Sequence, residues 1–518
     1  MSGLILANLL AAFVLAAAGD DETSALAAAI ARAPDGGEVV LASGDHFIRG
    51  LVPVQGKRSF TLRGEPGARL VVHVSRGNLL NDGNNALVVR DSEDFRLKGL
   101  AFSTDAPVNA TGRIAGVDVR KGTFDVCLDG DEPFVGTEPV AGFDTCLPSG
   151  MPDRVLEMSG RLSQERNAQG VVEMRVIGVP YEFLPPRTLR FSRPYDGKYD
   201  LRKLTVGHRV VLRHSLWGGA LMTFTDVKGA RIEDVSVERC RMMAVVIGKG
   251  CRDFSFERFR IAPRKGSGAL ISSNADGIHA LGLGGSLTLT DCEFRGLGDD
   301  AVNVHASLRK VGTEVPALAA TERCYDPETF TLRDVPRPGD VILDRAAQPS
   351  VRIRRTTCRA MRARGFLLQT SDVAVEDCRF TDIGSAGVLC APDAVKWLEG
   401  GPSENVRIAG CRFENCATTR SAGPQAAAVQ FATDHGGGGN APAGVHRNLM
   451  ITGNRFVRCG GAAVGLTSVR TARVSGNVFE NCSVRPEDAD VPDVRIRLCE
   501  DVTVADNVTT KDKKRGAK

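Results

Sequence analysis

The segment LTLTDCEF (Leu287–Phe294) decides the fold, because its alternating apolar residues followed by Cys return along the chain. Later copies carry Cys or Asn at the sixth position: VAVEDCRF (Val373–Phe380), VRIAGCRF (Val406–Phe413), LMITGNRF (Leu449–Phe456), ARVSGNVF (Ala472–Phe479) and VTVADNV (Val502–Val508). A short strand that recurs every roughly two to four dozen residues buries its apolar face only by stacking on its neighbours, about 4.8 Å apart. The sequence therefore predicts an all-β fold, a right-handed parallel β-helix of the pectate-lyase-like kind.

The sixth position of the repeat holds Cys240, Cys292, Cys378 and Cys411 in some copies and Asn454, Asn477 and Asn507 in others. Cys240 enters through an earlier copy, VSVERCRM (Val235–Met242). A position that accepts either residue is typical of a turn or an inward-facing ladder, so we expect free thiols there. Cys127 and Cys146 lie outside the repeat and are better candidates for a disulfide.

Two stretches without the repeat, 118–214 and 309–364, contain strand-like pieces and are interpreted as two small inserted β-barrel domains. The other predicted units are a leader (1–18), an N-terminal cap with the first coils (19–117), coils with the candidate site (215–308), C-terminal coils (365–508) and a basic tail (509–518). Within the cap, Asp20–Ala33 is predicted to be a helix that covers the first coil, because Leu26 and Ile30 share one face and Pro34 follows.

Composition and the N-terminus limit the function classes. The formal net charge of the 518 residues is +4, a balance too even for a nucleic-acid-binding protein. Leu4–Ala18 is an apolar run too short for a membrane span, and it ends in three alanines like a secretory signal peptide, although a basic start is missing. We expect a secreted or periplasmic protein without a membrane span; a buried N-terminal segment is the alternative.

Three aspartates lie one repeat apart, Asp276 in SSNADGIHALG and Asp299 with Asp300 in GLGDDAVNVHA. Aligning the two strands places Asp276 under Asp300 and His279 under Asn303, with Asp299 one residue ahead of the column. Neighbouring coils carry alanine in this column, so stacked carboxylates do not serve packing. Like charges this close repel and raise one pKa, an arrangement found preferentially at functional sites.

The residues alone leave three interpretations of this cluster open. In glycoside hydrolysis a protonated carboxyl donates to the leaving oxygen while an ionised one activates water or attacks the sugar. The carboxylates could instead bind Ca²⁺, which takes six to eight oxygens, or they could belong to ordinary turns. His279 and His305 flank the aspartates as candidate sugar ligands. No close His/Cys spacing indicates zinc.

Four ordered segments are similar to glycoside hydrolase family 110, the exo-acting α-1,3-galactosidases, over roughly Arg213 to Phe413. They are NADGIH (274–279), CEFRGLGDDAVNVH (292–305), RARGFLLQTSDVAVEDCRF (362–380) and WLEGGPSENVRIAGCRF (397–413). The aspartates also resemble those of family 28 polygalacturonases, but the Gly-His-Gly and Arg-Ile-Lys motifs of that family are absent at suitable distances. Ala306 stands where family 110 usually has Gly, which bears on substrate preference.

The family 110 resemblance implies an inverting hydrolase that removes terminal α-linked galactose without a metal or other cofactor. Asp276, Asp299 and Asp300 would be catalytic; by analogy with polygalacturonases, Asp299 is assigned as the acid and the other two position water. Inversion leads us to expect the acid and base about 6.5–9.5 Å apart. The substrate-binding candidates are His279, Asn303, His305, Arg364, Glu399, Trp397 and Trp217. A salt bridge is the alternative for Arg364 and Glu399, and core packing for the two tryptophans.

Two other functions remain open from the sequence. One is a polysaccharide hydrolase of polygalacturonase type, and the other is a β-helix that binds carbohydrate without turnover. A lyase is disfavoured because the sequence offers the aspartates no clear basic partner. Branched blood-group-B-type ends, linear α-1,3-galactosyl ends and algal galactans all fit as the natural glycan.

Overall fold

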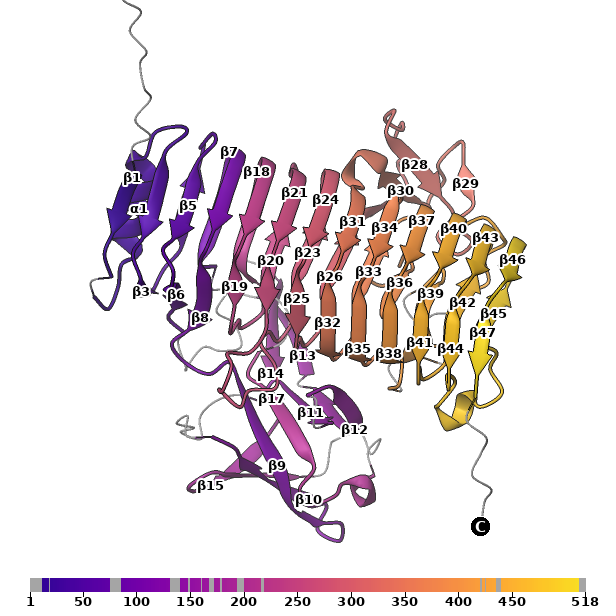
Figure 1. Ribbon diagram of the computed structural model, residues 1–518, viewed down its shortest axis with the longest axis horizontal. Helices are drawn as coiled ribbons and strands as arrows, with labels where there is room; N and C mark the ends of the chain where they lie inside the picture. The colour runs from indigo at the N-terminus through magenta and orange to yellow at the C-terminus, as the bar shows by residue number, and fades with distance from the viewer. Residues whose placement is uncertain are drawn as a thin grey trace, which may run out of the picture.

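The computed structural model describes residues 12–511 except 18, 75–84, 131–139, 148–149, 160, 167–171, 178, 193–199, 216–218, 420–421, 424 and 435–438. Its strands wind into stacked coils that run from the N-terminus to the C-terminus across Figure 1. Successive coils pair in parallel along three faces around one apolar core. This arrangement confirms the predicted parallel β-helix.

The first face holds β4 (Val52–Gln55), β20 (Met243–Ile247), β23 (Ile278–Leu281), β26 (Val302–His305), β33 (Phe366–Gln369), β36 (Val388–Cys390), β39 (Ala427–Phe431), β42 (Ala462–Thr467) and β45 (Val494–Arg497). The second face holds β1 (Ala12–Leu15), β2 (Glu38–Leu41), β5 (Thr61–Gly64), β21 (Arg252–Glu257), β24 (Gly284–Thr290), β31 (Ser350–Arg354), β34 (Val373–Glu376), β37 (Glu404–Ala409), β40 (His446–Thr452), β43 (Val469–Ser475) and β46 (Glu500–Ala505). The long strands β7 (Leu87–Lys98) and β18 (Ala220–Glu233) turn the corner and belong to both faces.

The third face is a separate parallel sheet of twelve strands. It holds β3 (Gly44–Ile48), β6 (Ala68–Val72), β8 (Ala101–Thr104), β19 (Ser236–Val237), β22 (Arg260–Ile261), β25 (Glu293–Arg295), β32 (Thr357–Met361), β35 (Arg379–Ile383), β38 (Arg412–Cys416), β41 (Arg455–Val457), β44 (Val478–Glu480) and β47 (Val508–Thr510). The phenylalanines that end the repeat stack inside it, with ring centroids 4.7 Å apart for Phe380 and Phe413 and 4.9 Å for Phe413 and Phe456. These distances match the coil spacing, so each coil continues the core of the last.

The sixth position of the repeat forms an inward ladder. Asn454 Nδ2 donates to the carbonyl of Ile408 at 2.9 Å, and Cys411 Sγ donates to the equivalent carbonyl of Val375 at 3.6 Å. Each side chain also accepts the N–H of the preceding ladder residue, Asn454 Oδ1 from Cys411 at 2.9 Å and Cys411 Sγ from Cys378 at 3.4 Å. Cys and Asn therefore make equivalent hydrogen bonds at this position, and the ladder cysteines are free thiols.

Two details of the predicted repeat are wrong. Cys240 is not a ladder residue: Val235 takes that position, because Ile232 pairs with Phe256 and fills the inward position before it. Cys240 pairs instead with Ser273. The sequence also missed a coil in which Thr356, neither Cys nor Asn, occupies the ladder.

The first insert leaves the β-helix as a seven-stranded antiparallel sheet (Figure 1). Its strands are β9 (Asn109–Asp118), β10 (Thr123–Leu128), β11 (Gly142–Cys146), β12 (Pro152–Ser159), β15 (Tyr181–Leu184), β16 (Thr188–Ser192) and β17 (Arg209–Arg213), with η2 (Leu201–Lys203) and the separate pair β13 (Arg161–Arg166) and β14 (Val172–Ile177). The insert thus begins at Asn109 and not at residue 118, because β9 pairs with β10 and β17. Among the described strands the sheet order is open, where a closed barrel was expected.

The expected disulfide between Cys127 and Cys146 is wrong, since both are free thiols. Cys127 lies on β10 and Cys146 on β11, and β9 and β17 separate these strands in the sheet. Three strand spacings amount to about 14 Å, twice the Cα separation that a disulfide bridges.

The second insert is a four-stranded antiparallel sheet of β27 (Leu308–Lys310), β28 (Glu322–Tyr325), β29 (Leu332–Arg333) and β30 (Val341–Asp344), followed by η3 (Arg345–Ala347). It ends near Asp344 and not at residue 364, because β31 and β32 return to the β-helix in the coil that Thr356 marks. The described strands of this insert are also open in order.

Helix α1 (Thr23–Arg32) buries Leu26 and Ile30 in the core of the first coils, which confirms the predicted cap. Strand β1, which precedes the helix in the chain, pairs in parallel with β2, which follows it. The predicted leader falls partly on residues 1–11, outside the described residues, so its cleavage stays a prediction. A turn at η5 (Pro486–Asp488) precedes the last coil. No helix in the described part of the chain is long and apolar enough to cross a bilayer.

The ladder predicts the effect of changing Asn477. Its Oδ1 accepts from Asn454 N and Nδ2, and its Nδ2 donates to Ile451 O. Asn477→Ala leaves these buried groups unpaired and should cost roughly 2–4 kcal/mol, at about 1–3 kcal/mol for each unsatisfied group. Asn477→Cys should cost clearly less. Unfolding midpoints of the two variants decide the matter, and equal losses would contradict the ladder.

Candidate functional site

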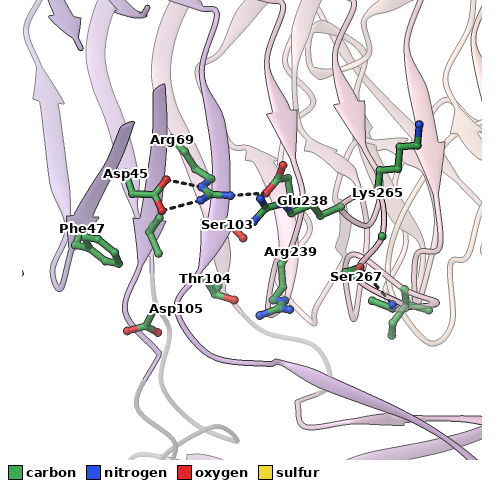
Figure 2. A pocket seen from close by; sticks show the side chains of 15 residues that line it. Asp45, Phe47, Arg69, Ser103, Thr104, Asp105, Glu238, Arg239, Lys265 and Ser267 are labelled. Atoms are coloured by element: carbon green, nitrogen blue, oxygen red, sulfur yellow. Dashed lines mark hydrogen bonds and ion pairs between the residues drawn. The ribbon is translucent and has the colours of Figure 1, made fainter. Parts of the chain in front are cut away.

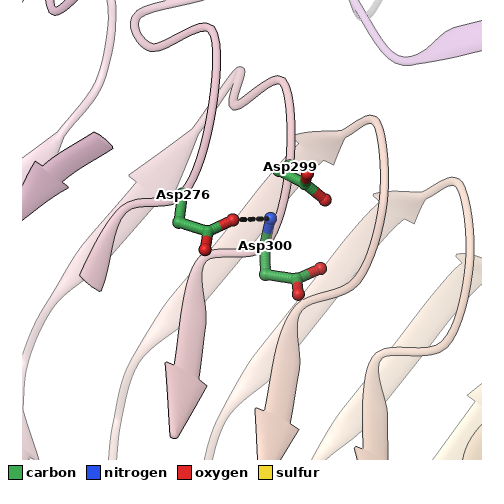
Figure 3. Close-up of side chains that lie close together, drawn as sticks. All are labelled: Asp276, Asp299 and Asp300. Atoms are coloured by element: carbon green, nitrogen blue, oxygen red, sulfur yellow. Dashed lines mark hydrogen bonds between the residues drawn. The ribbon is translucent and has the colours of Figure 1, made fainter. Parts of the chain in front are cut away.

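The three aspartates meet on the first face, in the turns that lead into β23 and β26 (Figure 3). His279 pairs with Asn303 in the parallel register, so three residues earlier Asp276 lies beside Asp300, as predicted. The register continues to the next coil, where Arg364 occupies the same column, and then to Ala386. Aligning the repeats in the sequence placed Asp276, Asp300 and Ala386 in this column. It did not identify the Arg364 guanidinium beside Asp300.

The carboxylates are packed closely and hold one another in place. Asp276 Oδ1 accepts the backbone N–H of Asp300 at 3.0 Å, and Asp276 Oδ2 lies 2.7 Å from Nδ1 of His279. Each of Asp276, Asp299 and Asp300 offers an oxygen within 4.8 Å of the other two. Asp276 and Asp300 are buried, whereas Asp299 is half-buried at the edge of the group.

The expected separation of about 6.5–9.5 Å between acid and base does not describe this triad. The nearest oxygens lie closer, because adjacent coils stack at the spacing of a parallel sheet and Asp299 directly precedes Asp300. Hydrogen bonds of about 2.8 Å on either side would let a single water span such a gap.

Asp300 is the most perturbed carboxyl of the site. Its Oδ1 accepts from the backbone N–H of Arg364 at 3.1 Å and from Nε at 2.8 Å. Burial raises the pKa of Asp300 to about 7; Arg364 works against this, while Asp299 and Asp276 add to it. For Arg364, burial favours the neutral form, but the Asp300 charge outweighs it and the pKa is raised above its ordinary value. A carboxyl that changes charge near neutral pH is suited to proton transfer.

The two histidines and the amide form the adjoining wall. His305 Nε2 lies 3.1 Å from His279 Nε2, and Asn303 Nδ2 lies 3.5 Å from His279 Nδ1. Burial lowers the pKa of His279, but the hydrogen bond and charge of Asp276 outweigh it and the pKa is raised overall. His279, Asn303 and His305 are therefore brought together with the aspartates, as predicted.

Glu399 and Trp397 reach the site region on the loop between β36 and β37. Glu399 Oε1 lies 3.7 Å from Nε2 of His305. Burial raises the pKa of Glu399 to about 7, His279 lowers it and Asp276 raises it further. Trp397 is 51% exposed, which excludes core packing, and Lys396 Nζ lies 4.8 Å from the centroid of its ring. Trp217 lies outside the described residues.

The carboxylate cluster fits a metal ion poorly. One oxygen of Asp276 accepts a backbone N–H, the other contacts His279, and Asp300 Oδ1 is engaged by Arg364. Ca²⁺ needs six to eight oxygens, and a guanidinium already provides the positive charge beside the cluster.

A buried ion network that sequence reasoning missed ties the first insert to the site. Asp144 on β11 lies 3.1 Å from Nη2 of Arg213 and 3.5 Å from Nε of Arg362, and its side chain is 2% exposed. Arg362 Nη1 also donates to the carbonyl of Gly298 at 3.3 Å, directly before Asp299. A Cβ on Gly298 would lie 2.2 Å from the carbonyl oxygen of Asn274, so this turn is closely packed. No local pattern could reveal the network, because its partners are far apart in sequence.

A separate cavity of about 570 Å³ lies on the third face (Figure 2). Its central Arg69 donates to both oxygens of Asp45, at 2.8 and 2.6 Å, and lies 3.3 Å from Glu238. Asp105 is bound to His73 at 2.6 Å. Four charged side chains of this cavity, Asp45, Arg69, Asp105 and Glu238, are thus paired within the protein. Among the described carboxyls, those with a raised pKa are Asp300 and Glu399, which lie at the candidate site.

Comparison with known proteins supports the predicted resemblance. No known family profile matches the chain. It is 28% identical over 296 residues to "Alpha-1,3-galactosidase A" of Akkermansia muciniphila, covering 48% of each chain. It is 23% identical over 445 residues to the protein of the same name from Shewanella woodyi, covering 75% of this chain and 68% of the relative. The chain spans about half the length, or less, of several curated relatives it matches.

Among solved structures, the chain is similar to the catalytic unit of a GH87 α-1,3-glucanase from Streptomyces thermodiastaticus strain HF3-3. The identity is 14% and the TM-score 0.38, over 95% of this chain and 68% of that one. This likeness is too distant to bear on the reaction.

The raised pKa of Glu399 predicts a pH-dependent effect of Glu399→Gln on stability. With a folded-state pKa of about 7 and an unfolded value near 4.5, the wild-type fold loses stability as pH rises between them, by up to about 3 kcal/mol. Glu399→Gln removes this loss. The variant should unfold at a higher midpoint than the wild type at pH 8, whereas at pH 4.5 the two should agree. A larger gain at low pH would contradict the assignment.

The ion network predicts that Asp144→Asn impairs both fold and site. Removing one partner of a buried pair typically costs about 3–5 kcal/mol, and it frees Arg362 from the insert. The melting temperature and the kcat for the glycoside substrate should both fall. Asp125→Asn is the matched control, since Asp125 forms a more exposed pair with Arg190 on the same insert. A folded Asp144→Asn variant with unchanged kcat would exclude the network from positioning Asp299.

Proposed function

We propose that the protein is a glycoside hydrolase that releases terminal α-1,3-linked galactose by inversion. The observation that carries the proposal is the column of Asp276, Asp300 and Arg364 with Asp299 beside it, lying in segments that resemble α-1,3-galactosidases. The three carboxyls differ in burial and partners, which is what separate acid and base roles require.

In this proposal Asp299 is the general acid, because it is the least buried of the three and reaches the edge of the cluster. Asp276 and Asp300 hold the attacking water between their oxygens. Asp300, with a pKa of about 7, takes the proton from this water as it attacks the anomeric carbon. Before this proton transfer Asp300 is ionised, and Arg364 stabilises its negative charge.

The remaining polar side chains bind galactose. His279, His305 and Asn303 form one wall, and Glu399 closes the far side next to His305. The half-exposed ring of Trp397 offers an apolar face of the kind that packs against a sugar. Neutral sugars need such combined polar and apolar surfaces, since they carry no charge to be recognised.

A lyase is the less favoured reading of the same site. The structure does supply the basic partner that the sequence lacked, Arg364 beside Asp300. Its raised pKa keeps that guanidinium protonated, so it cannot serve as the base that a lyase needs. Non-catalytic carbohydrate binding would leave the close, costly stacking of two carboxylates without a purpose.

The proposal is tested with p-nitrophenyl α-galactoside and Gal-α1,3-Gal, with and without a chelator. We expect galactose release that the chelator does not change, and β-galactose as the first anomer seen by NMR. On Gal-α1,3-Gal, whose leaving group needs protonation, Asp276→Asn, Asp299→Asn and Asp300→Asn should each lower kcat by about 10²–10⁴-fold, whereas Asp45→Asn in the third-face cavity should not. α-Galactose as the first product would refute inversion, and no release with retention on a galactose column would refute catalysis.

The assignment of Asp299 has its own test. Azide can replace a missing base or nucleophile but not a missing acid. With a substrate whose leaving group needs no protonation, Asp299→Gly should keep substantial turnover that azide does not increase. Restoration of turnover by azide in Asp299→Gly would move the acid role to another carboxyl.

A further inference from the structure

We propose that a cavity between the second insert and the β-helix binds an oxyanion substituent, a sulfate or a carboxylate, on a carbohydrate chain. The cavity has a volume of about 380 Å³. It is lined by residues of the insert, of η3, of the starts of β37 and β40 and of the turns before these strands, among them Arg323, Tyr325, Phe330, Arg345, Glu404 and Arg447. That the ligand is a carbohydrate rests on the proposed function.

Positive charge dominates this cavity. Arg323, Arg345 and Arg447 line it from three separate segments, against the single carboxylate of Glu404. Among the described residues, no carboxylate lies within ion-pair distance of any of the three arginines. The contrast with the third-face cavity is direct, because Arg69 there is held by two carboxylates.

Backbone carbonyls orient two of the guanidinium groups without neutralising them. Arg323 Nη1 donates to the carbonyls of Ala320 and Glu322 at 3.0 and 2.7 Å, and Arg447 Nε donates to that of Gly444 at 2.9 Å. Each guanidinium keeps further N–H groups that can donate to a ligand. Sulfate and carboxylate match the planar fork of arginine, and such charge-assisted bonds are stronger than neutral ones.

The aromatic residues give the cavity an apolar floor. Tyr325 and Phe330 are 7% and 5% exposed, and their ring centroids lie 6.4 Å apart. Phe330 has φ of 50°, a left-handed conformation that is unfavourable for a bulky side chain. Bonds within the turn, from Phe330 N to Asp326 O and from Asp326 N to Thr331 O, hold it there. Strain of this kind is concentrated at binding sites.

The polar tip of Tyr325 faces the charged groups of the cavity. Burial raises the pKa of its hydroxyl, Arg345 and Arg323 lower it, and Glu404 raises it. The phenol therefore lies among two of the arginines and the carboxylate. Tyr325 has an apolar ring face and a polar hydroxyl at the ring edge. This combination suits a sugar that carries a charged group.

The cavity is connected to the aspartate cluster by short lengths of chain. Strand β27, which opens the second insert, begins three residues after His305, and Pro402 follows Glu399 by three residues. The segments that line the cavity therefore neighbour, along the chain, two residues of the candidate site. Among the open glycans, this favours galactans that bear sulfate or uronate groups over neutral ends.

The experiment is calorimetric titration of the full chain with three oligosaccharides of equal length: a sulfated galacto-oligosaccharide, an oligogalacturonate and a neutral galacto-oligosaccharide. We expect at least one anionic probe to bind more tightly than the neutral one, and more weakly as salt increases. The double variant Arg345→Gln/Arg447→Gln should weaken that binding by about tenfold or more, the loss expected when charge-assisted bonds are removed. The probe that responds identifies the group.

The matched control is Arg231→Gln/Arg352→Gln, which removes the same charge from exposed arginines outside the cavity. Its affinity should stay at the wild-type value. The inference is overturned if both double variants behave alike, if neither anionic probe exceeds the neutral one, or if inorganic sulfate binds as tightly as the sulfated sugar. Turnover of p-nitrophenyl α-galactoside by the unchanged chain is measured in parallel. If turnover is absent while the arginine effect holds, the hydrolase proposal fails and the oxyanion site stands.

Discussion

The site depends on the parallel register that stacks Asp300 between Asp276 and Arg364. Coils about 4.8 Å apart force the two carboxyls together, and the Arg364 guanidinium on the next coil and His279 beside Asp276 offset their repulsion. A slip of one residue would turn this column away from its face and separate all three groups. The raised pKa of Asp300 follows first from its burial in this column, against Arg364, with Asp299 and Asp276 adding to it.

The ladder of Cys, Thr and Asn residues is what fixes that register along the fold. The Cys and Asn ladder residues donate to a carbonyl of the preceding coil and accept a backbone N–H, as Asn454 and Cys411 illustrate, whereas Thr356 donates to Arg354 O within its own coil. Stacked phenylalanines add packing but are compatible with several registers. The directional hydrogen bonds therefore select one alignment, and the apolar core makes that alignment stable.

Sequence reasoning reached the β-helix, the capping helix and the vertical pairing of Asp276 with Asp300, because each depends on a local period that a single chain displays. It failed where another residue takes the ladder position, as Thr356 does, and where two short patterns overlap, as at Val235 and Cys240. It also missed Arg364 as the partner of Asp300 and Asp144 as the partner of Arg362, since these contacts join distant segments. Insert boundaries were displaced for the same reason.

The two inserts contribute differently to the proposed site. The first insert reaches the turn before Asp299 through Asp144 and Arg362, so it helps to fix the position of the reacting carboxyls. The second insert leaves the β-helix just after His305 and packs its aromatic residues against it. Arg323, Arg345 and Arg447 line the cavity at this contact. A β-helix alone offers an open face suited to long polymers. In the proposed function, a brace on one side and a charged cavity on the other would let the same face hold a defined chain end and recognise the units beyond it.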